Sequence, residues 1–95
     1  MVVKIVSVLP MTQRSYTDRQ GRADVFKTKG FIFLHSTGEF YAEAIQKDAE
    51  ALDSMDIKSG DIAFVSFRFV CRNYKTAQGE TRYSNEITLS NMILI

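Results

Sequence analysis

The segment from Arg72 to Ile87 carries the side chains best suited to binding chemistry. Basic and aromatic residues alternate there on both sides of Gly79, a residue typical of a hairpin turn. Arginine and lysine contact phosphates, and tyrosine rings offer flat platforms on which unpaired bases stack, each worth about 1–3 kcal/mol. Because duplex DNA hides its base faces, such a surface favours single strands. A hairpin whose tyrosines only pack across its strands has the same composition, so both interpretations stay open.

The order and spacing of these residues resemble the last hairpin of bacterial single-stranded DNA-binding proteins. That family has Arg, any residue, Trp, then Gly, then Arg-Tyr, two polar residues, Glu and a β-branched run. The matching residues here are Arg72, Tyr74, Gly79, Arg82, Tyr83, Ser84, Asn85, Glu86 and Ile87. Residues 57–61 and, more loosely, 46–51 resemble the family's approach to strand four and its helix start. The chain has no Trp and no Gly/Pro/Gln-rich tail with an acidic tip. We therefore expect a truncated chain or a short tail-less relative, comparable with primosomal replication protein B.

The resemblance implies an OB-fold that binds single-stranded DNA. Tyr74 stands where the family stacks a base on Trp, and Arg72 and Lys75 flank it as phosphate partners. Arg82 and Tyr83 match the family's Arg-Tyr pair, in which the tyrosine is as easily structural as functional.

A second group of cations and rings lies within the first 30 residues. Residues 14–23 are polar, with Gly21 as turn punctuation, and predict an exposed loop. An OB-fold binds oligonucleotides or oligosaccharides over strands two and three, between its one-two and four-five loops. Phe26 is as easily a core residue as a base platform. We expect the nucleic-acid site to contain Arg14, Tyr16, Arg22, Phe26, Lys27, Lys29, Arg72, Tyr74, Lys75, Arg82 and Tyr83.

The elements that must position these residues are mostly strands. Strand-like segments cover residues 2–9, 24–36, 40–45, 61–72 and 82–95, with Gly30 predicting a bulge or sharp bend. Apolar residues spaced by three predict one helix from Lys47 to Met55. The sequence therefore predicts a single all-β domain over residues 1–95 with one short helix. We expect a five-stranded OB-fold Greek-key barrel with the helix between strands three and four, and an SH3-like barrel as the alternative.

Large apolar residues divide into a predicted core and a predicted interface. A domain this small has few other groups to fill its centre, so we assign to the core Phe31, Phe33, Phe40, Phe67 and Phe69. Alternation along residues 61–72 puts Ile62 and Phe64 on the opposite side of their strand. Exposed apolar residues there predict an interface in a homodimer or homotetramer.

Composition excludes several classes of protein. With 45% hydrophobic residues in 95, the chain is not a disordered tail. One Cys (Cys71) and one His (His35) are too few for a metal site, and no catalytic constellation is visible, so we expect no enzyme, metal or cofactor. No apolar run reaches membrane-spanning length and no secretion signal is visible, which together with the lone cysteine predicts a cytoplasmic protein without membrane partners. The net charge of +1 conceals a basic first third and an acidic middle.

We therefore expect a protein that binds single-stranded DNA with low sequence specificity in replication, repair or recombination. RNA remains open, because stacking and phosphate contacts do not distinguish the sugars. Two other classes remain: an OB-fold assembly subunit of a replication or primosome complex acting through protein contacts, and an oligosaccharide-binding barrel.

Overall fold

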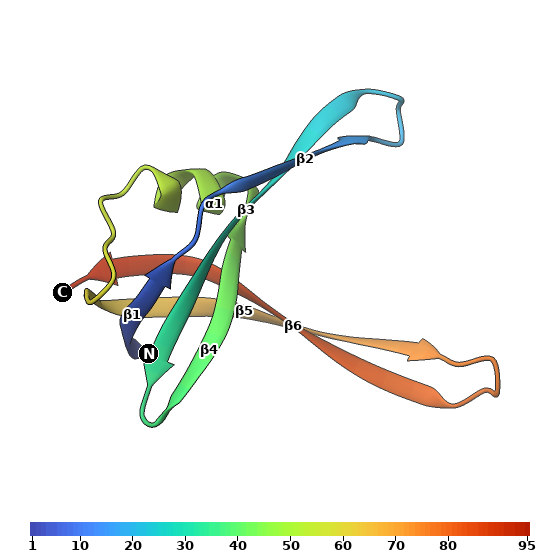
Figure 1. Cartoon of the computed structure of the whole chain (residues 1–95). Helices are drawn as coiled ribbons and strands as arrows, with labels where there is room; N and C mark the ends of the chain where they lie inside the picture. The colour runs from blue at the N-terminus through green and yellow to red at the C-terminus, as the bar shows by residue number, and fades with distance from the viewer.

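The computed structural model describes all 95 residues and consists mainly of β-strands (Figure 1). The elements, in chain order, are β1 (Val2–Val8), β2 (Thr12–Thr17), β3 (Ala23–His35), β4 (Gly38–Ile45), α1 (Gln46–Asp53), β5 (Ile62–Lys75) and β6 (Thr81–Leu94). No helix has the length and apolar character needed to cross a membrane.

Five of the strands form a ring of hydrogen-bonded neighbours. Strand β1 pairs with both β3 and β5, and the order around the ring is β1-β3-β4-β6-β5. All of these pairings are antiparallel except that of β4 with β6, which is parallel and joins Glu43 to Thr88. The helix lies between β4 and β5 in sequence. The predicted all-β class with one helix is thus confirmed.

The number of strands differs from the predicted five because the first predicted strand is followed by a second short one. Pro10, which lacks a backbone N–H, separates β1 from β2. Strand β3 is long enough to pair with both strands, with β1 through Phe31 and with β2 through Thr28. Residues 14–17, predicted as loop, are therefore strand. Periodicity could not reveal β2 because every one of its residues is exposed.

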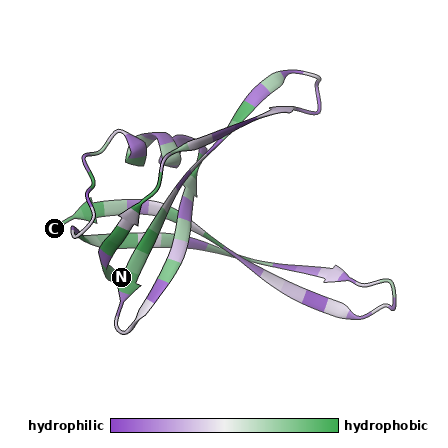
Figure 2. Cartoon of the chain, viewed as in Figure 1, coloured by the Kyte–Doolittle hydropathy of each residue, from purple (hydrophilic) through white to green (hydrophobic).

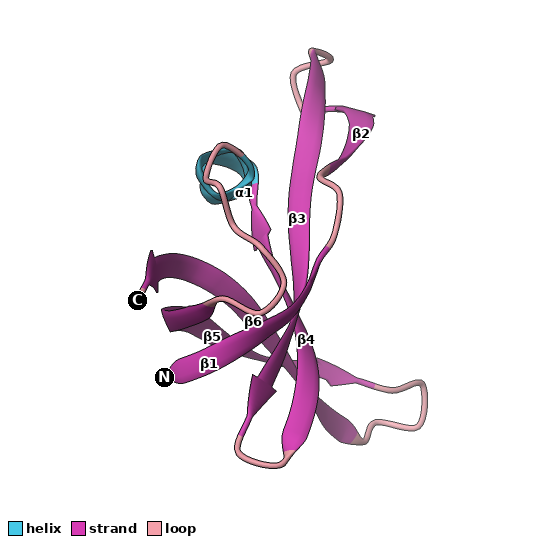
Figure 3. Ribbon diagram, turned by 60° about the vertical axis from the view of Figure 1, so that its left-hand side comes forward, coloured by secondary structure: helices cyan, strands magenta, loops and turns pink.

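Two long hairpins project from the ring (Figures 1 and 3). We call the paired residues 12–28 of β2 and β3 the first arm, and residues 68–88 of β5 and β6 the second arm. Their tips, residues 18–22 and 76–80, have the same design: a glycine with positive φ (+79° and +81°) donates its N–H to the carbonyl of the first tip residue. Only glycine adopts this conformation without a steric penalty, which explains the expected turns at Gly21 and Gly79.

The core lies inside the ring and leaves the arms bare. Phe31 and Phe33 are fully buried and stack with centroids 5.6 Å apart, while Phe40 and Phe67 pack partly buried against Phe33. Figure 2 shows the apolar colour gathered in the ring and mostly polar colour along the arms. The prediction for Phe69 was wrong: its side chain is 71% exposed, because β5 has left the ring there and entered the second arm.

Gly30 makes a close approach to a side chain, and of its two predicted roles, a bulge or a sharp bend, the bulge does not occur there. It stays in register with Glu43 on β4, and the irregularities of the sheet fall elsewhere, in β1 between Ile5 and Ser7 and beside Ser66. A Cβ atom at position 30 would lie 2.7 Å from the hydroxyl oxygen of Tyr41. The missing side chain therefore makes room for the Tyr41 ring.

Helix α1 is fixed to the ring by two apolar and two ionic contacts. Ala49 and Leu52 are buried, and no side chain caps its first turn. Lys27 and Lys29 of β3 form ion pairs with Glu50 and Asp53 of the helix. The helix ends at Asp53, two residues before the predicted end.

Candidate nucleic-acid interface

The pairing register divides the residues of the second arm between two faces. Residues that pair directly across a sheet point to the same side, and successive residues point to opposite sides. The pairs Arg72–Ser84 and Tyr74–Arg82 therefore share one face. The pairs Phe69–Ile87 and Asn73–Tyr83 share the other, which continues from the partly buried Phe67 and its buried partner Leu89.

We call the side of the sheet that faces away from the core the outer face. On the second arm it carries Arg68, Val70, Arg72, Tyr74, Arg82, Ser84, Glu86 and Thr88. Tyr74 is 54% exposed, and its hydroxyl has no hydrogen-bond partner. Tyr83 is 72% exposed but lies on the inner face, the side that continues from the core. The two tyrosines expected in one site thus point to opposite sides of the arm.

The first arm divides in the same way. Thr12, Arg14 and Tyr16 pair with Thr28, Phe26 and Asp24, and all six lie on the outer face. The guanidinium carbon of Arg14 lies 5.7 Å from the centroid of the half-buried Phe26 ring, within the range of a cation–π contact. The Tyr16 hydroxyl donates a hydrogen bond of 3.2 Å to Asp24. Partial burial and this bond raise the pKa of Tyr16.

The outer faces of the two arms belong to one continuous surface. On β4 the outward residues are Glu39, Tyr41 and Glu43, because Ala42 and Ala44, which alternate with them along the strand, are buried. Glu43 pairs with Gly30 on one side and with Thr88 on the other. Thr88 in turn pairs with Arg68. The register therefore leads from Phe26 and Arg14, across β4 and β6, to Arg72 and Tyr74 without leaving the outer face.

Two of the predicted cations are occupied in contacts with helix α1. Lys29 is 6% exposed, and its Nζ lies 3.0 Å from Asp53 Oδ1 and 5.9 Å from the Phe31 ring centroid. The Lys27 ammonium forms an ion pair with Glu50. The Lys27 backbone N–H donates a hydrogen bond of 3.3 Å to the side-chain oxygen of Gln46. These lysines hold the helix to β3, and neither lies on the outer face.

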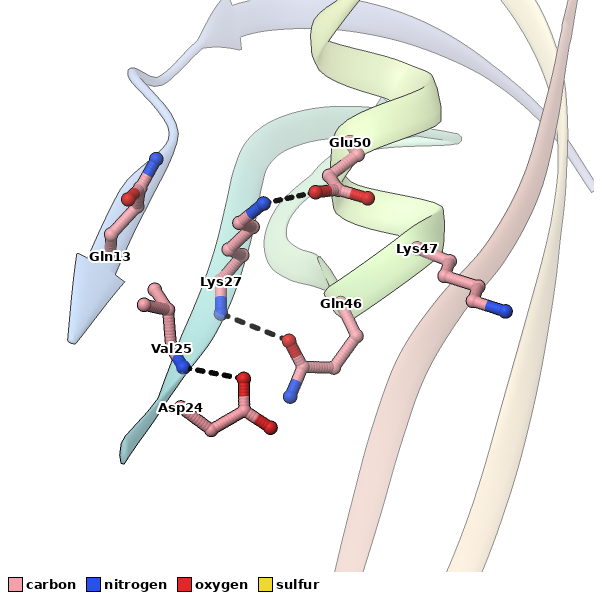
Figure 4. A pocket seen from close by; sticks show the side chains of 7 residues that line it. All are labelled: Gln13, Asp24, Val25, Lys27, Gln46, Lys47 and Glu50. Atoms are coloured by element: carbon pink, nitrogen blue, oxygen red, sulfur yellow. Dashed lines mark hydrogen bonds and ion pairs between the residues drawn. The ribbon is translucent and has the colours of Figure 1, made fainter. Parts of the chain in front are cut away.

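Figure 4 shows the cleft in which Lys27 lies, between the first arm and the helix. It encloses about 490 Å³ and is lined by Gln13, Asp24, Val25, Lys27, Gln46, Lys47 and Glu50. Its two lysines are balanced by two carboxylates, so it presents no concentrated positive charge to a phosphate chain.

The remaining predicted cations are exposed. Arg22 and Lys75 lie near the tips of the two arms and form no ion pair. Arg72 bonds Glu86 at 2.8 Å, and Arg82 lies 3.4 Å from Glu80. Solvent-exposed pairs of this kind are worth about 0–1 kcal/mol, so exchanging a carboxylate for a phosphate costs little.

Three outer-face residues were missed by the sequence analysis: Arg68, Tyr41 and Glu43. Arg68 forms no ion pair and lies at the base of the second arm, paired with Thr88. Alternation with Arg72 was a usable signal for Arg68. No sequence signal pointed to Tyr41 and Glu43, because their position between the arms depends on the pairing of β4 with β6.

An apolar patch covers the outer face at the N-terminal end of β5. Ile62 and Phe64 are 40% and 45% exposed, as the alternation predicted. Val2 and Ile93 pair with Phe64 from either side, so the three side chains form one row across β1, β5 and β6. The patch comprises Val2, Ile62, Phe64, Ile93 and Ile95, all exposed.

The sequence matches no protein-family model, and no curated protein matches it either.

Proposed function

We propose that this protein is an OB-fold module that binds single-stranded DNA with low sequence specificity along the outer face of its two arms. The OB-fold is supported by the ring order, by the parallel pairing of β4 with β6, and by the helix between β4 and β5. In this interpretation β1 and β2 are two halves of one barrel strand interrupted at Pro10.

The observation that carries the binding function is the continuity of the outer face. Tyr16 and Phe26 from one arm and Tyr74 from the other share it, together with Arg14, Arg68, Arg72 and Arg82. Rings that stack bases and cations that contact phosphates are the two elements of sequence-tolerant single-strand binding. The resemblance of residues 72–87 to bacterial single-stranded DNA-binding proteins supports the same function. Lys27, Lys29 and Tyr83 are not part of this proposal, because they lie off that face.

Titration of a fluorescently labelled dT oligonucleotide at several salt concentrations tests the proposal. Four arginines on the outer face, each contacting one phosphate, give a log–log slope of affinity against salt of about −3. Arg72→Ala is expected to make that slope shallower by about 0.7. Lys58→Ala, which removes an exposed cation from the connection between α1 and β5, is the matched control and leaves the slope unchanged. Absence of binding at low salt contradicts the proposal.

The apolar patch favours a second candidate, an assembly subunit that acts mainly through protein contacts. A contiguous exposed apolar surface on a sheet is characteristic of interaction sites. Under this candidate the chain self-associates or joins a replication complex through the patch, and it binds dT oligonucleotides weakly at every salt concentration.

A further inference from the structure

A small cavity opens on the outer face at the foot of the first arm. It encloses about 290 Å³ and is lined by Arg14, Phe26, Thr28 and Glu43. One wall is the Phe26 ring with the Arg14 guanidinium over it, and the other carries the Glu43 carboxylate. Arg14 and Glu43 form no ion pair with each other, so both keep hydrogen-bonding capacity for a ligand.

The carboxylate of Glu43 is held in place by its neighbours. The Tyr41 hydroxyl donates a hydrogen bond of 2.7 Å to Glu43 Oε2. The Tyr41 ring lies against Gly30, where a side chain would collide with it. Glu43 is also half-buried. The group is therefore oriented before any ligand arrives, and Oε1 forms no hydrogen bond within the chain.

This cavity suits a base rather than a phosphate. A phosphate placed there would lie beside the Glu43 carboxylate and be repelled by it, whereas a neutral base meets no such cost. The Phe26 ring and the Arg14 guanidinium over it provide flat surfaces on which a base can stack. The exposed arginines of the arms then contact the phosphate backbone of the bound strand.

Among the bases, guanine has the hydrogen-bonding groups that match both polar walls. Its O6 and N7 atoms are acceptors, for which arginine is the commonest partner. Its N1–H and exocyclic amino group are adjacent donors that a carboxylate can accept together. Thymine offers a single N–H between two carbonyl oxygens, and those oxygens would face the carboxylate. Resting on the proposed binding function, we infer that the cavity of Arg14, Phe26 and Glu43 is a base pocket that prefers guanine over thymine.

Competition between oligonucleotides tests the pocket in the native protein. The probes are a dT oligonucleotide and the same strand with one central dT replaced by dG, dA, dC or deoxyinosine. The dG strand is expected to bind about five- to tenfold more tightly than the dT strand, the lower part of the range for a well-formed bidentate contact. Deoxyinosine lacks only the exocyclic amino group of guanine, so its affinity falls between the two. Equal affinities for the dG and dT strands overturn the pocket but leave the binding function intact.

Two variants that each remove one negative charge test whether Glu43 causes the preference for guanine. Glu43→Gln is expected to bring the dG/dT ratio close to one, while Glu39→Gln, which removes the same charge from an outward residue of β4 that does not line the cavity, keeps it. A Glu43→Gln protein that keeps the full ratio overturns the assignment. Circular dichroism checks that both variants fold, and the deoxyinosine comparison decides the question without any variant. Failure of every strand to bind at low salt overturns the proposed function, and the pocket with it.

Discussion

Replacing Tyr74 by Ala is expected to weaken nucleic-acid binding more than it lowers the free energy of unfolding. Its ring is 54% exposed, its hydroxyl forms no hydrogen bond, and its cross-strand neighbour is Arg82 on the free-standing second arm. Loss of one exposed cross-strand pair costs about 0.2–1 kcal/mol of stability. Loss of one stacked base costs about 1–3 kcal/mol of binding, which weakens affinity for a dT oligonucleotide by about five- to 150-fold.

Tyr83→Ala is the matched control for this experiment. It removes the same side chain from the same arm, with a similar exposure of 72%, but from the inner face. Fluorescence anisotropy should give nearly native affinity for Tyr83→Ala, and urea denaturation should give similar free energies of unfolding for both variants. If both variants lose the same affinity, the division of the arm into a binding and a non-binding face is refuted. A Tyr74→Ala protein that binds normally but unfolds more easily would make Tyr74 a packing residue.

Three further predictions concern acidity, stability and self-association. The hydrogen bond to Glu43, with partial burial, raises the pKa of Tyr41 to about 12 from its ordinary 10.0. The stability that this hydrogen bond contributes is therefore present below pH 10 and is lost as the pH rises towards 12. Glu43→Gln should lower the pKa of Tyr41, as measured by phenolate absorbance. Phe33→Ala, at a fully buried ring, should lower the free energy of unfolding by about 3–5 kcal/mol in urea denaturation, whereas Phe69→Ala should cost well under that amount. Phe64→Lys places a charge in the apolar patch and should abolish self-association in sedimentation, without changing affinity for a dT oligonucleotide; an unchanged sedimenting mass would contradict a role for the patch between copies of the chain.

Alternation of apolar residues correctly predicted which side chains are buried where the strand lies in the ring. The alternation of residues 61–72 correctly separated Ala63 and Val65, which are buried, from Ile62 and Phe64, which are exposed. The same alternation failed at Phe69, because the strand continues past the edge of the ring, where no opposing layer covers the inner face. Strand β2 buries none of its residues and owes its conformation to pairing with β3.

Long-range ion pairs also escaped the sequence analysis. Lys27 and Lys29 look like part of a basic first third, and the acidic residues of the helix look like a solvated face. Folding places Glu50 and Asp53 against these two lysines, so part of the apparent basic surface is neutralised. A count of charges along the chain cannot predict this, because the partners lie 23 and 24 residues apart.

Local sequence was enough to predict every strand except β2, the short helix, the glycine turns of both hairpins and the aromatic and cationic residues that they carry. These features depend on backbone preferences and on side chains a few positions apart. Which of those residues share a surface depends on the pairing of strands that are distant along the chain. The parallel contact of Glu43 with Thr88 joins the outer faces of two hairpins that are distant in sequence, and it leaves Tyr74 on that surface and Tyr83 behind it. The physical reason is that a strand's own alternation defines two faces, but the neighbours with which it pairs determine what each face meets.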